Sequence, residues 1–68
     1  MRDHNGVQIH IGDTVQVIAP RKPEQPVGIV IAFDASIVRM RAPDGNCTGW
    51  YGENVTVLDS DLQMDEGL

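Results

Sequence analysis

The sequence predicts a small all-β domain, and its length, composition and patterning each support this. Its 68 residues suffice for one domain only. Val and Ile, which favour strands, are the commonest apolar residues. They recur in short stretches separated by Gly, Pro, Asn and Asp, and no stretch has the spacing of an amphipathic helix. Five or six short antiparallel strands are therefore expected in residues 1–62, closed into a small barrel or packed as a sandwich.

The first two strands are predicted on either side of a Gly-Asp pair at residues 12–13. Residues 3–6 end in Asn-Gly, a strong turn signal. Residues 7–11 then alternate apolar and polar, as in a half-buried strand. In the next strand, Val15 and Val17 should point to one side and Thr14, Gln16 and Ile18 to the other. Residues 19–26 contain three prolines and are expected to form a loop.

The middle of the chain predicts a central hairpin. Residues 27–33 are nearly all apolar, which indicates a strand buried on both faces. Gly28 within it suggests a bulge or a close backbone contact. In residues 37–42, Arg39 and Arg41 share one face of the strand. Pro and Gly in residues 43–46 then form a turn.

The C-terminal part predicts two further strands. Residues 47–51 form the first, broken at Gly52, and residues 55–58 form the second. Residues 59–62 resemble a single helical turn, and residues 63–68 are expected to be a flexible acidic tail.

Charge and cysteine content restrict the function. The net charge is −5, but residues 12–58 hold four basic and five acidic side chains and are nearly balanced. This argues against duplex DNA as a partner, because such binding needs clustered Lys and Arg. The chain begins with polar residues and contains no long apolar run, so we expect a cytoplasmic protein without membrane contact. The single cysteine excludes an internal disulfide; neither zinc nor another cofactor is expected, and self-association remains open as a source of extra burial.

Six residues are candidates for a binding surface. Trp50 and Tyr51 are adjacent in a strand, so one ring should lie in the core and the other outside. The pattern leaves the choice open, and we favour an exposed Tyr51 because its hydroxyl tolerates water. The basic residues can form one patch that grips RNA or an acidic protein, or remain a solvated face paired with nearby acids. These basic candidates are Arg21, Lys22, Arg39 and Arg41.

Catalysis has little support in the sequence. Cys47 needs an adjacent base to act as a nucleophile, and the two histidines, His4 and His10, lie in the N-terminal segment. We therefore expect a small, semi-buried thiol. A metal site formed by His4, His10 and Asp13 matches no ligand spacing.

Two stretches resemble known small barrels. Residues 12–18, a loop and then residues 27–30 resemble the KOW motif of SH3-like barrels in ribosomal proteins and transcription elongation factors. Residues 51–62 are similar to the C-terminal half of Tudor domains, which are also SH3-like barrels. The resemblance implies an SH3-like fold and, from the KOW half, contact with RNA, a ribosome or RNA polymerase. The family's loop is rich in Gly and Lys, whereas here three prolines accompany Arg21 and Lys22.

Type II dihydrofolate reductases are also SH3-like barrels of this length and act as tetramers. Their Val-Gln-Ile-Tyr strand lies late in the chain, whereas residues 7–10 here read Val-Gln-Ile-His. We therefore assign no activity or site residue of these reductases to this chain. The sequence thus predicts a non-enzymatic module that binds another protein, of the kind found in phage or mobile elements. The alternative is a KOW-like domain that binds RNA, a ribosome or RNA polymerase, and a small oligomeric enzyme of the type II dihydrofolate reductase kind is the third, disfavoured reading.

Overall fold

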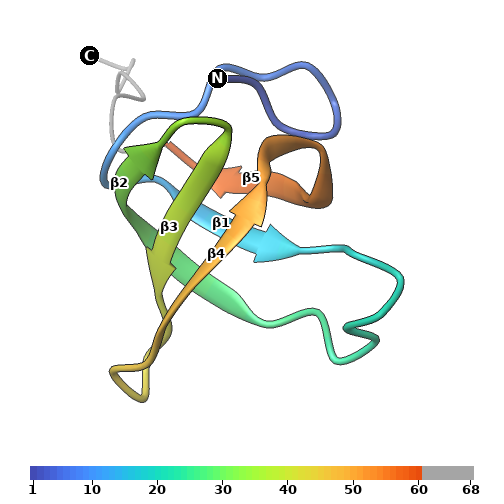
Figure 1. Cartoon of the computed structure of the whole chain (residues 1–68), viewed down its shortest axis with the longest axis vertical. Helices are drawn as coiled ribbons and strands as arrows, with labels where there is room; N and C mark the ends of the chain where they lie inside the picture. The colour runs from blue at the N-terminus through green and yellow to red at the C-terminus, as the bar shows by residue number, and fades with distance from the viewer. Residues whose placement is uncertain (61–68) are drawn as a thin grey trace, which may run out of the picture.

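The computed structural model describes residues 1–60, which form a single antiparallel sheet of five strands (Figure 1). The strand order is β4-β3-β2-β1-β5, and every neighbouring pair is antiparallel. This confirms the predicted all-β class. The elements are β1 (Thr14–Val17), β2 (Val27–Asp34), β3 (Ile37–Arg41), β4 (Cys47–Tyr51), the 3₁₀ turn η1 (Gly52–Asn54) and β5 (Val55–Asp59).

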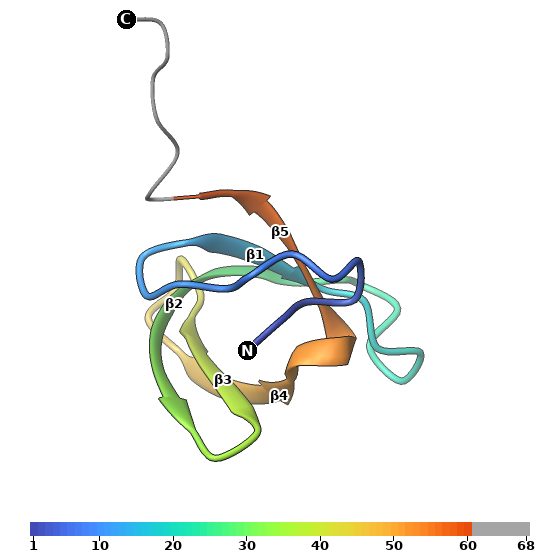
Figure 2. The same cartoon turned by 90° about the horizontal axis from the view of Figure 1, so that it is seen from above.

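The sheet curls but does not close, which corrects the prediction of a closed barrel. β4 and β5 are its two edges, and η1 joins them in sequence without pairing them. Figure 2 shows the strands following an arc, with the N-terminal segment crossing one end of it. Ile9 N donates to Met1 O at 2.8 Å, and Arg2 and Gln8 form an isolated bridge. The N-terminal segment thus covers an end of the sheet.

The strand predicted at residues 7–11 is absent from the structure. Only Ile9 of its three apolar residues is buried, at 2% exposure, whereas Val7 and Ile11 are exposed. Gly6 and Gly12 have φ of 82° and 99°, so the backbone turns sharply at both ends of the segment. The segment between these two turns is too short to pair with another strand. Of its alternating apolar side chains, only that of Ile9 is buried.

β2 is buried on one face only, which corrects the prediction of a strand covered on both sides. Val30 lies in the core at 1% exposure, whereas Ile29 and Ile31 are 43% and 37% exposed. The register slips between Val30 and Ala32, so that Val30 pairs with Met40 and Ala32 with Arg39. This bulge reverses the alternation beyond it, because an extra residue is accommodated on one strand.

The core confirms the alternation predicted for β1 and β3. Val15 and Val17 are fully buried, and so is Val38, while Arg39 and Arg41 point away from the core. Cross-strand partners lie on the same face of a sheet, so Val38 and its partner Trp50 both face the core. The buried apolar residues are Ile9, Val15, Val17, Ala19, Val30, Val38, Met40, Trp50 and Val55.

The C-terminal predictions fall partly outside the described residues. Asp59, expected to begin a helical turn, is the last residue of β5. The rest of that turn, the domain boundary at residue 62 and the tail 63–68 lie beyond residue 60. Within residues 1–60, no helix has the length and apolar character needed to span a membrane.

Gly28 makes the close backbone contact that its position predicts. A Cβ atom there would lie 2.7 Å from Met40 Cε and 2.8 Å from the carbonyl oxygen of Arg41. We expect Gly28→Ala to destabilise the fold by about 1–3 kcal/mol, because the opposing β3 backbone must move. Gly49→Ala is the control: its Cβ would lie 2.7 Å from Ile37 Cγ2, a side-chain atom that can rotate away, and an ordinary 4.0 Å from the carbonyl oxygen of Val38. Equal losses in urea unfolding would contradict this assignment.

Candidate functional site

Trp50 and Tyr51 leave β4 on opposite sides, as expected for adjacent strand residues. Trp50 is 7% exposed, and its indole Nε1 donates to Thr48 Oγ1 at 3.0 Å. Tyr51 is 54% exposed. Tyr51, the ring favoured from the sequence, is therefore the exposed one, and the residue before it in β4, Trp50, is anchored in the core.

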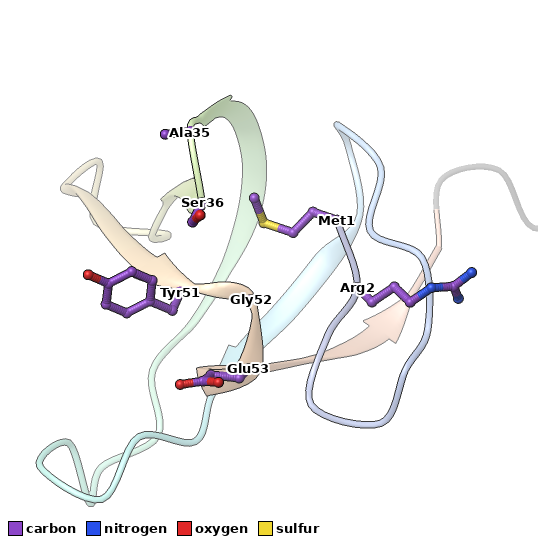
Figure 3. A pocket seen from close by; sticks show the side chains of 7 residues that line it. All are labelled: Met1, Arg2, Ala35, Ser36, Tyr51, Gly52 and Glu53. Atoms are coloured by element: carbon purple, nitrogen blue, oxygen red, sulfur yellow. The ribbon is translucent and has the colours of Figure 1, made fainter.

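Tyr51 stands between two shallow hollows. One has a volume of about 640 Å³ and is bordered by Met1, Ala35, Ser36 and Glu53, among others (Figure 3). The other, of about 400 Å³, is lined by Tyr51 together with residues of the β1–β2 loop and of η1. We call Tyr51 and these two hollows the Tyr51 surface. Its full lining is Met1, Arg2, Ala19, Pro20, Arg21, Ala35, Ser36, Tyr51, Gly52, Glu53 and Asn54.

The loop supplies one of the predicted basic residues to this surface. Arg21 places its guanidinium carbon 5.5 Å from the centroid of the Trp50 ring, a cation–π arrangement, and it also lines the second hollow. Lys22 is paired with Glu24, with 3.7 Å between Nζ and Oε2. Arg21 thus contacts Trp50 and lines a hollow that Tyr51 also lines, while the charge of Lys22 is partly neutralised within its own loop.

Arg39 and Arg41 project from the outer face of β3, which is the face opposite the core. Their cross-strand partners on β4 are Gly49 and Cys47. The predicted basic residues are therefore divided between the loop and this outer face. In the loop, Arg21 contacts Trp50 and Lys22 pairs with Glu24.

The outer face carries a hollow that the sequence did not predict. Its volume is about 690 Å³, and Ile29 and Ile31 border it together with Arg41. The sequence interpretation missed this site because it placed both isoleucines in the interior. The sequence does contain a signal for this site. Arg39 and Arg41 of the neighbouring strand β3 share one face, which indicates that this face of the sheet is exposed to solvent. The lining is Thr14, Val27, Gly28, Ile29, Ile31, Arg41, Ala42 and Pro43.

Asp3 is a buried carboxylate that holds the N-terminal segment against β5. Oδ1 accepts from Asn5 N and Val7 N, and Oδ2 accepts from Val57 N, each at 2.8 Å. Burial by itself raises the pKa of Asp3, but these three donors and the nearby His4 outweigh it and lower the pKa below its ordinary value. This side chain fixes the segment that carries Met1 and Arg2 beside Tyr51.

Asp13 is fully buried at the turn before β1. Its Oδ2 accepts from His10 N at 2.8 Å, and Ser60 Oγ donates to Oδ1 at 3.2 Å. His10 Nδ1 lies 3.8 Å from Oδ2. Among residues 1–60, no group of three His, Cys, Asp or Glu side chains is placed to hold a metal ion. The contacts described for Asp13 tie the turn to the end of β5.

Cys47 is exposed at the start of β4, which corrects the expected semi-buried thiol. Its Sγ lies 3.9 Å from Gly45 O, across the β3–β4 turn. His4 Nδ1 lies 3.3 Å from Glu53 O, at the opposite end of β4. The turn at residues 43–46 brings the thiol to the edge of the sheet rather than under it.

Comparisons with protein-family models, with curated proteins and with solved structures give no match.

Proposed function

We propose that this chain is an SH3-like domain acting as a non-enzymatic protein-binding module, with the Tyr51 surface as its contact site. Five antiparallel strands in one curled sheet are compatible with that fold, although the sheet is open. Similar small β domains serve many unrelated functions, so the binding proposal rests on the surface and not on the fold.

The exposed ring of Tyr51 carries the proposal. It is 54% exposed, although its neighbour Trp50 is fixed in the core. Tyrosine is enriched among residues that dominate binding energy, because it offers a large rigid contact area and one polar atom. The hollows on both sides provide room for partner side chains. Their linings include two cationic side chains, Arg2 and Arg21, and one carboxylate, Glu53.

Tyr51→Ala is expected to weaken partner binding by about 2 kcal/mol or more, roughly thirtyfold, as for a central contact residue. The partner is isolated by affinity capture from the source organism with the unmodified chain, and its affinity is then measured by calorimetry. Leu58→Ala is the matched control, because Leu58 is 53% exposed and lies on β5, outside the Tyr51 surface. Equal affinities of the Tyr51→Ala variant and the original chain would contradict the proposal.

The RNA alternative predicts a different result. A titration with single-stranded RNA should show binding at low salt that falls steeply as salt is added, if Arg21, Lys22, Arg39 and Arg41 contact phosphates. The protein-binding proposal predicts no RNA binding at low salt. RNA binding that is lost in Arg39→Ala and Arg41→Ala variants would replace it.

A further inference from the structure

We propose that the outer face of β1, β2, β3 and β5 packs against the same face of a second copy, forming a two-fold symmetric dimer. The proposal does not depend on the Tyr51 surface. Tyr51 pairs with Ile37, at the other end of β3 from Arg41. Four residues along a strand correspond to about 13 Å. A dimer centred between β1 and β2 therefore leaves the Tyr51 surface accessible.

One row of side chains crosses this face and is defined here as the outer row. Cross-strand partners lie on the same face of a sheet. Arg41 pairs with Ile29, Ile29 with Thr14, and Thr14 with Asp59. Arg41, Ile29 and Asp59 are all exposed. The row thus has a cation at one end, an acid at the other and an exposed isoleucine between them.

This order of charges is complementary to itself. Neighbouring strands are about 4.8 Å apart, so the backbones of Arg41 and Asp59 are separated by roughly 14 Å measured along the curled sheet, and by less in a straight line. A two-fold axis parallel to the strands, midway between Ile29 and Thr14, brings Arg41 opposite Asp59 of the second copy. The same rotation brings Ile29 opposite Thr14 of the second copy. Because the axis generates each contact twice, two ion pairs flank one central patch.

The centre of the proposed interface is apolar and hollowed. Ile29 and Ile31 are 43% and 37% exposed, and the hollow of about 690 Å³ lies around them. Isoleucines on a sheet face lose contact with water when another sheet packs on them at about 10 Å. A domain of this length buries only a modest core by itself, so such burial has a large relative effect on its stability.

Arg39 provides a matched control on the same face. It lies two residues from Arg41 and is also exposed, but its partners are Ala32 and Gly49. Its row contains no acid corresponding to Asp59. Reversing either arginine changes the net charge equally, yet only Arg41 has an opposite charge facing it in the proposed dimer.

The test measures the dimer dissociation constant by sedimentation equilibrium from about 1 µM to about 1 mM protein. The full chain should dimerise within this range. Arg41→Asp and Asp59→Arg should each raise the constant by about tenfold or more, because each places like charges together at two sites. The double variant should return to within about threefold of the original chain, since both pairs are restored in reverse.

Several results would overturn the proposal. A monomer at every concentration would exclude the proposed dimer. Equal effects of Arg39→Asp and Arg41→Asp, or no recovery in the double variant, would exclude the proposed ion pairs. Circular dichroism of each variant establishes that it is folded. Ile29→Glu provides a second probe, because it should abolish dimerisation while the monomer retains its β-sheet spectrum.

Discussion

Replacing Asp3 by Ala is expected to destabilise the domain by about 3 kcal/mol or more, a large share of the stability of so small a fold. The carboxylate accepts three backbone N–H groups, from Asn5, Val7 and Val57. Alanine leaves all three donors without this acceptor in a site where Asp3 is only 6% exposed. Urea unfolding at neutral pH measures the loss.

Asp44→Ala is the control for this substitution. Asp44 also accepts a backbone N–H, from Asn46 at 3.0 Å, but in an exposed turn. We expect a loss of no more than about 1 kcal/mol there, because water replaces the lost acceptor. Similar losses for Asp3→Ala and Asp44→Ala would contradict the role assigned to Asp3.

The same carboxylate should make the fold sensitive to acid. The pKa of Asp3 is lower in the folded protein than in the unfolded chain. Its contribution is therefore complete above the unfolded pKa of about 4 and is lost as the pH falls through the folded pKa. In Asp3→Asn, the free energy of unfolding should be lower at neutral pH and should fall less steeply below about pH 4. Parallel pH profiles of this variant and the original chain would contradict the assignment.

Trp50→Ala is the second substitution with a large expected effect, a loss of about 3–5 kcal/mol. The indole packs in the core layer with Val38, and its outer side receives the guanidinium of Arg21. Alanine would leave a cavity between β4 and the rest of the core and would remove the contact that positions the loop. Thermal unfolding followed by circular dichroism measures the effect.

Two variants separate core packing from surface contacts at this point of β4. Trp50→Phe retains a buried ring and loses the Nε1 hydrogen bond to Thr48, so we expect a smaller loss than for alanine. Tyr51→Ala removes a ring that is 54% exposed and should change stability by less than about 1 kcal/mol. A larger loss for Tyr51→Ala than for Trp50→Ala would reverse the assignment of inner and outer rings.

The parts of the fold that were predictable depend on local patterns. Val15 and Val17 alternate with polar residues, and Arg39 and Arg41 alternate with buried ones, so β1 and β3 could be oriented from sequence. The glycine of the β3–β4 turn, Gly45, has φ of 93°, as its turn sequence predicts. In each case the residues that decide the structure lie within a few positions of one another.

The sequence-based predictions fail where the structure is determined by contacts between distant residues or by a shift in strand register. The bulge between Val30 and Ala32 changes which side chains face outward, and nothing in an almost wholly apolar stretch marks its position. Asp3 acquires its role from Val57, 54 residues away, and was visible in the sequence only as part of a turn. The division of the basic residues follows from the path of the loop that carries Arg21 onto Trp50. Alternation alone does not specify that path.

The most direct test of the binding account is to map amide chemical shifts of the labelled chain as the captured partner is added. The account predicts the largest changes at Tyr51, Glu53, Ser36 and Arg21, which border the two hollows. Little change is expected at the β3–β4 turn around Asp44, because Cys47 and Tyr51 lie at opposite ends of β4. Changes concentrated at that turn, with Tyr51 unaffected, would contradict it.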